Sequence, residues 1–277
     1  MIREATLYAS PGANSNTLVQ VERGSDLVIL ERSNSDNQTW EKVFVTLAQG
    51  QQTRELTGWA PGKAIITTST ANGDQIVFGQ AVASEHEAEE RGGRKGAAQD
   101  AMQLYARVAE LFPGSPLAAE AMWRSADIRW QLAKADFVRS GTPMEEKYLK
   151  AVMAKFPQSK QAELAAYDLL ENKLCPEWRG MAECPEKESV LFEQYAREHP
   201  QSTKAAEALY NAAWRQAAVT DMYRIENDTA KSEAARKKAL AMAQQVASQY
   251  QDDWKPRGMD LIYKLEKKIP VYGPATD

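Results

Sequence analysis

The chain has 277 residues with 34 Lys or Arg and 38 Asp or Glu, which gives a formal net charge of −4. Hydrophobic residues make up 43% and charged residues 26%, which excludes extensive disorder. The slight acidic excess excludes a general attraction to nucleic acid. No apolar run approaches the roughly 18 residues that a membrane span requires. At about 150 residues per domain, the length predicts about two domains.

The first residues, Met1-Ile2-Arg3-Glu4, contain neither the basic segment nor the apolar segment of a secretory signal. Taken literally, this start predicts a cytoplasmic protein. The same start would remain if an export signal, with or without a lipid anchor, had been removed and a Met added. The periplasm or cell envelope and the cytoplasm therefore both stay open.

Up to about residue 70 the sequence has short β-rich runs separated by clusters of turn-forming residues. A turn or short helical corner is expected at Thr57–Gly62, before a last strand at Ala64–Ile66. Five short strands in about 65 residues fit a small barrel. The other runs with clear strand character are Thr17–Val21, Leu27–Leu30 and Trp40–Val45.

The order of these features resembles a bacterial SH3 domain over about residues 3–67. The resemblance implies an SH3-like β-barrel that meets cell-wall peptide or a neighbouring domain. It makes Tyr8, Trp40 and Trp59 candidates for an aromatic groove that accepts an extended peptide. The alternative for Trp40 and Trp59 is the core of the barrel. The residues that carry the resemblance are Ala5–Tyr8 with Pro11-Gly12, Val21–Gly24, Leu27–Leu30, Trp40–Val43 and Thr57–Pro61.

A connecting segment at residues 71–96 separates this part from the rest of the chain. It contains a candidate helix, Gln75–Glu90, followed by three glycines in five residues from Gly92 to Gly96. Such a run is typical of a flexible joint. The sequence therefore predicts an SH3-like domain at 1–70, a linker at 71–96 and a helical domain at 97–277.

The helical part contains an internal repeat. A corner of the form aromatic-Pro-x-Ser recurs, with the first three prolines 44 and 43 residues apart. Pro disfavours helix in the residue before it, and Ser two residues later is expected to cap the next helix. Four helix pairs follow, at about 99–138, 144–173, 187–225 and 230–268. The corners are Leu111–Ser115, Lys155–Ser159, Glu198–Ser202 and, in degenerate form, Gln249–Asp253.

Downstream of the first three corners, alanines and an aromatic residue recur at matching positions, as in Ala118, Ala121 and Trp123. This pattern resembles the TPR-like repeats of the lipoprotein in the outer-membrane barrel-assembly machinery. It is also similar to those of the periplasmic TPR protein that coordinates with the Tol system. The resemblance implies a right-handed solenoid that exposes a binding face. Gln103 and Arg107, polar residues on the first repeat helix, are candidates for partner contact.

The sequence contains no nucleophile elbow, phosphate loop, dinucleotide fingerprint or zinc-protease motif. His86 has no second His or Cys one turn away and is expected to be solvated. His199 occupies the aromatic position of its corner and is expected to pack there. No catalytic residue, metal or cofactor is therefore expected. Cys175 and Cys184 flank a loop containing Pro and Gly, and are either disulfide-bonded or two free thiols.

These features together predict a multidomain α and β protein, with an SH3-like β-barrel followed by an all-α, TPR-like solenoid. The expected function is that of a non-catalytic adaptor or scaffold. Its helical repeats are expected to bind a protein or peptide partner in the bacterial cell envelope. Two alternatives stay open. One is a module that binds peptidoglycan peptide through the SH3-like domain. The other is a cytoplasmic TPR scaffold.

Overall fold

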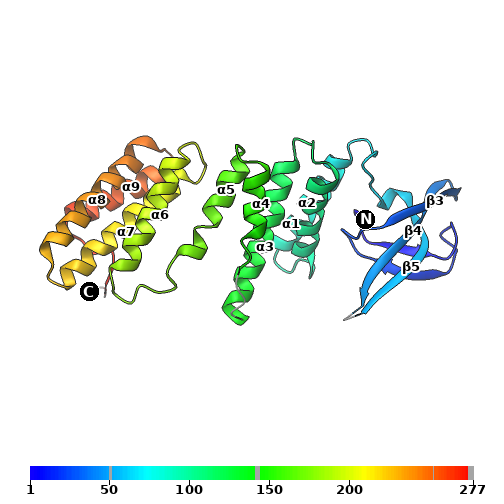
Figure 1. The fold of residues 1–277 in the computed structure, drawn as a ribbon, viewed down its shortest axis with the longest axis horizontal. Helices are drawn as coiled ribbons and strands as arrows, with labels where there is room; N and C mark the ends of the chain where they lie inside the picture. Colours follow the sequence, from blue (N-terminus) through cyan, green and yellow to red (C-terminus); the bar gives the residue numbers. More distant parts are fainter. Residues whose placement is uncertain (50–51, 141–143, 252, 274–277) are drawn as a thin grey trace. The chain divides into compact units, whose positions relative to one another are not determined.

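The computed structural model describes residues 1–49, 52–140, 144–251 and 253–273. Within these ranges, five β-strands precede nine α-helices (Figure 1). The chain divides into two compact units, the first ending at Tyr148 and the second beginning at Leu149. That division falls inside helix α4 (Lys147–Lys155). The boundaries expected at residues 70 and 96 stay predictions.

The strands form one antiparallel sheet in the order β2-β1-β5-β4-β3. Its core includes Leu7, Val21 and Val43, all with at most 1% of their surface exposed. Asp36 and Asn37 connect β3 to β4 and both have positive φ, as the tight turns of β-hairpins require. The strands are β1 (Ala5–Tyr8), β2 (Thr17–Val21), β3 (Val28–Ser35), β4 (Gln38–Gln49) and β5 (Gln52–Pro61).

Two details of the predicted barrel are wrong. The sheet is open, since β2 and β3 are its edges and no ladder joins them in the described residues. The last strand is β5 rather than Ala64–Ile66, and Gly62–Ala64 forms a 3₁₀ turn. Thr57–Pro61, expected as a corner, pairs with the first half of β4. Gly58 and Pro61 are turn-forming residues, so residue propensities alone did not predict a strand here. Pairing with β4 determines the conformation of this segment.

The first unit continues with helices that pack on one another. α1 (Gly73–Glu89) lies against α2 (Ala97–Leu111), and α2 lies against α3 (Ala118–Ser140). The helix expected within the connecting segment is thus present as α1. Gly92 and Gly96, between α1 and α2, have positive φ, a conformation that glycine adopts without steric cost. The buried residues of this cluster include Val77, Ala81, Ala101, Leu104 and Val108.

The second unit is built around α7 (Ala205–Ile225), which is the helix in the middle of the packing. α7 contacts α6 (Glu183–Glu198), α8 (Thr229–Gln249) and α9 (Trp254–Glu266), as the yellow-to-red part of Figure 1 shows. Every residue from Gln216 to Met222 is buried. A helix that is buried all round needs small or apolar residues on every face, which explains its many alanines. α5 (Lys160–Asp168) and a 3₁₀ turn at Glu171–Lys173 precede this bundle.

Eight helices lie at the positions of the four predicted pairs, and α2/α3, α6/α7 and α8/α9 pack against each other, whereas the packing of α4 on α5 stays a prediction. Their stacking into a right-handed solenoid stays a prediction. α2, α4 and α6 each end two residues before the proline of their corner. Asp252, in the degenerate fourth corner, lies outside the described residues. The alanines that recur after the corners are all buried, with at most 6% exposed: Ala118, Ala121, Ala162, Ala165, Ala205 and Ala208.

The capping role expected of the corner serines is confirmed for one of three. The Ser159 hydroxyl accepts the Ala162 amide and caps α5. Ser115 and Ser202 instead accept the amide two residues on. These two hydroxyls also have partners elsewhere in the fold: Ser115 donates to Asp74, and Ser202 bonds Tyr195. Ser115 and Ser202 are thus bonded to other side chains of the fold as well, whereas Ser159 caps the helix that follows it.

Candidate functional site

The aromatic residues proposed for a groove on the sheet are mostly buried. Trp40 exposes 1% of its surface, and its indole N–H donates to the Ser35 carbonyl oxygen at 3.2 Å. The Tyr8 ring is half-buried and meets Trp40 edge-on, with 5.4 Å between ring centres. Trp59 exposes 8%. Trp40 and Trp59 are thus largely covered by the protein itself, although neither belongs to the apolar cluster of the sheet around Leu7.

Gln103 and Arg107, proposed for partner contact, lie against the chain's own loop after β2. Arg107 Nη2 lies 2.6 Å from the Asp26 carboxylate, and its Nε donates to the Gly24 carbonyl oxygen at 3.3 Å. A Cβ placed on Gly24 would come within 2.8 Å of the Gln103 Cβ, so the two residues are in close contact. Both polar side chains therefore join α2 to the sheet within the first unit.

Neither histidine has the surroundings of a metal ligand or a base. His86 is exposed and lies 3.5 Å from Glu90 alone, and the His199 ring packs 4.8 Å from the Tyr195 ring. In the part of the chain that the structure describes, no three His, Cys, Asp or Glu side chains gather as a metal site would require.

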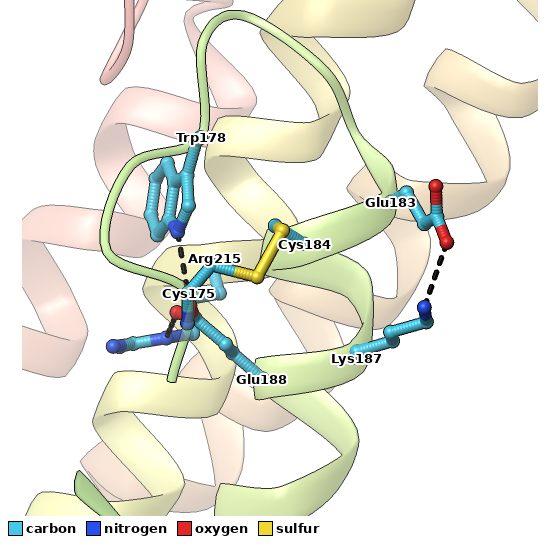
Figure 2. The surroundings of a disulfide bond; sticks show 7 residues. All are labelled: Cys175, Trp178, Glu183, Cys184, Lys187, Glu188 and Arg215. Carbon is cyan, nitrogen blue, oxygen red and sulfur yellow. Dashed lines mark hydrogen bonds and ion pairs between the residues drawn. A yellow bond between two sulfur atoms is a disulfide. The ribbon is translucent and has the colours of Figure 1, made fainter. Parts of the chain in front are cut away.

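Cys175 and Cys184 are joined in a disulfide that closes the loop before α6 (Figure 2). The Glu188 carboxylate, on α6, lies beneath this loop with 3% of its side chain exposed. It accepts the Cys175 amide at 2.8 Å, the Trp178 indole N–H at 3.1 Å and Arg215 Nε at 2.7 Å. A buried carboxylate is tolerated when it is paired and hydrogen-bonded in this way. The sequence analysis did not identify Glu188.

The segment after α9 is attached to α7 by a second buried carboxylate. Asp221 Oδ2 accepts the backbone N–H groups of Val271 at 2.7 Å and of Tyr272 at 3.1 Å. Its other oxygen lies 3.0 Å from Arg224 Nη2. The Tyr272 ring packs 5.7 Å from Trp178 of the disulfide loop. Residues 269–273, called the strap below, are therefore held from both sides.

A cavity of about 290 Å³ lies in the second unit between α7, α8, α9 and the strap; we call it the α7–α9 cavity. Its lining follows helical periodicity, with one row of residues at i, i+3, i+4 and i+7 on α7 and another on α8. The rows are Ala217, Thr220, Asp221 and Arg224 on α7, and Thr229, Ser232, Glu233 and Arg236 on α8. The remaining wall is formed by Asn227, Lys264, Leu265, Lys268, Ile269 and Val271.

The charges of this lining are mainly positive, with four cationic side chains and two carboxylates. Arg236 Nη2 lies 2.9 Å from Glu233, and this hydrogen bond holds the pKa of the Glu233 carboxyl below its usual value. In the sequence Arg236 is followed directly by Lys237 and Lys238, which form a basic stretch with it. In the structure only Lys237 and Lys238 are exposed, while Arg236 is half-buried. The sequence signal that could have indicated this cavity is the helical spacing of the polar residues on α7 and α8.

No protein-family model matches this chain, and a search of the curated proteins returns no match. Among the described helices, none combines the length and apolar character needed to cross a bilayer.

Proposed function

We propose that this protein is a non-catalytic adaptor or scaffold whose helical pairs bind a protein or peptide partner. The observation that carries the proposal is the repeated corner, with each of the first three followed by buried alanines at equivalent positions. Repeated helix pairs of this kind bury a continuous core and leave one face for a partner. In this proposal the pairs are TPR-like and stack as a right-handed solenoid.

We place the protein in the bacterial cell envelope. The Cys175–Cys184 disulfide supports this placement, because disulfides persist in oxidising compartments and are rare in the cytosol. A cytoplasmic scaffold is the alternative, and free thiols in native protein isolated under alkylating conditions would favour it.

The sheet is proposed to be SH3-like and to dock on the protein's own helices. Its contacts with α2 support this role, since Arg107 and Gln103 are engaged with the loop after β2. Binding of peptidoglycan peptide through the sheet is less favoured, because Trp40 and Trp59 are buried rather than open for stacking.

Crosslinking in cells, followed by mass spectrometry, tests the proposal on the full-length protein. Lys42 and Lys63 report on the sheet, and Lys187 and Lys237 report on the helices of the second unit. We expect crosslinks from the helices to a protein of the envelope. Recovery of wall fragments alone, attached to Lys42 or Lys63, would transfer the function to the sheet. Turnover of a wall substrate by the purified protein would contradict the non-catalytic assignment.

A further inference from the structure

We propose that the α7–α9 cavity binds the C-terminal carboxylate of a partner peptide whose last side chain is apolar. The inference rests on the proposed function and specifies the chemistry of the partner. Four observations carry it: the excess of cations in the lining, an apolar wall, the small volume, and the rigid support of the side chains.

The first observation concerns charge. Arg224 lies next to Asp221, Arg236 next to Glu233, and Lys264 lies 2.7 Å from Asp260. Lys268 forms no ion pair within 4 Å in the described residues, although its charge acts on the Glu233 carboxyl at longer range, and it is the cation in excess over the three carboxylates Asp221, Glu233 and Asp260. Each guanidinium has five N–H donors, and the bonds to Asp221 and Glu233 leave some of them unused. The lining thus offers one unbalanced positive charge and spare donors, which suit a single carboxylate.

The second and third observations concern the ligand's uncharged part. Leu265 from α9 and Ile269 and Val271 from the strap form an apolar wall beside the cations. A volume of about 290 Å³ is at the lower end of the range for ligand pockets, so it takes one terminal group rather than a large molecule. A carboxylate that carries an apolar side chain next to it satisfies both halves of the lining. Inorganic phosphate would leave the apolar wall unused.

The fourth observation is that the surrounding groups are held in place. Thr220 and Ser232 are buried, and the Ser232 hydroxyl donates to the Thr220 carbonyl oxygen at 2.9 Å, joining α8 to α7. Asp221 fixes the strap through two backbone N–H groups. A site whose walls are already ordered loses less entropy when a ligand binds.

The test is an NMR titration of the full-length, isotope-labelled protein with N-acetyl-alanyl-leucine. The probe is used as the free acid and as its C-terminal amide, which differ in the terminal charge alone. We expect the acid to shift the amide signals of Ser232 and Leu265 and to bind about tenfold more tightly than the amide, as loss of one charge-assisted contact predicts.

Two variants and one matched control accompany the titration. Lys268→Asn removes the unpaired charge, and asparagine tolerates the positive φ of 55° found there. Arg236→Gln removes a guanidinium but keeps a hydrogen-bond donor. Each should weaken binding of the acid by about tenfold. Lys238→Ala removes the same charge from an exposed position of α8 and should leave the affinity unchanged.

Three outcomes overturn the inference. Equal binding of acid and amide would remove the role of the carboxylate. Tighter binding of inorganic phosphate than of the dipeptide acid would indicate a phosphate site. An absence of shifts at Ser232 and Leu265 with every probe would refute the site, while crosslinks from the helices to a protein would still support the adaptor function. Binding of the dipeptide acid without such crosslinks would support the carboxylate site and count against the adaptor function.

Discussion

Arg215 of α7 donates from Nε to the Glu188 carboxylate of α6 at 2.7 Å, and the two side chains expose 12% and 3% of their surfaces. The same carboxylate accepts the N–H groups of Cys175 and Trp178. One buried acidic group therefore fixes both a helix pair and the disulfide loop beside it, as Figure 2 shows.

Glu188→Ala should lower the free energy of unfolding by about 3 to 5 kcal/mol, because it leaves Arg215 buried without its partner. Urea denaturation followed by circular dichroism measures the change. Glu183→Ala is the matched control, since Glu183 pairs with Lys187 at the exposed surface of the same helix. The control should change stability by less than about 1 kcal/mol. Equal effects of the two variants would show that Glu188 is not a support of the loop.

Removal of the disulfide in the double variant Cys175→Ser, Cys184→Ser should cost about 2 to 3 kcal/mol, since the bond restricts a short loop in the unfolded chain. The Glu188 contacts to the loop do not depend on the bond, so we expect the folded state to keep them. Urea unfolding of the variant and of the reduced wild type should give the same midpoint. If reduction of the wild type left its urea midpoint unchanged, the expected stabilisation by the disulfide would be contradicted.

The stability of the protein should decline between pH 10 and 12, and Tyr195 should contribute to the decline. Burial raises the pKa of the Tyr195 hydroxyl to about 12, above the value near 10 of an unfolded chain. Its neutral form therefore stabilises the fold below pH 10, and this contribution is lost as the pH rises through 12.

Tyr195→Phe should lose this pH-dependent contribution, worth about 3 kcal/mol, together with the hydrogen bonds to the Glu163 carbonyl oxygen and to Ser202. Its stability deficit relative to the wild type should therefore shrink between pH 10 and 12, as measured by urea unfolding at intervals of half a pH unit. Tyr263→Phe, at an exposed position of α9, is the control and should follow the wild type. A deficit for Tyr195→Phe that stays constant with pH would disprove the linkage.

Arg107→Ala should loosen the loop after β2 with little loss of global stability. The Arg107–Asp26 ion pair is partly exposed, so its removal should cost below about 1 kcal/mol. Amide hydrogen exchange at residues 22–27 should become faster. Glu110→Ala removes the other ion-pair partner of Arg107 but leaves Asp26 in place, and should not change the exchange of the loop. Equal exchange in both variants would show that Arg107 does not hold the loop.

The strands and helix pairs were largely predictable from sequence, since alternation, helical periodicity and the Pro-x-Ser corners act over a few neighbouring residues. The exception is β5, where Gly58 and Pro61 predicted a turn but pairing with β4 produced a strand. The open edges of the sheet also depend on pairing between strands distant in sequence, which no local pattern encodes.

The candidate site was less predictable. The order of residues in the sequence by itself predicted a folded chain with a helical repeat and without familiar catalytic motifs. It could not determine which polar side chains are buried together. Arg107 was a candidate for partner contact but pairs with Asp26, and Arg236, which lines the α7–α9 cavity, was not identified from the sequence. Burial and charge pairing depend on helices brought together across tens of residues, and only the tertiary structure decides them.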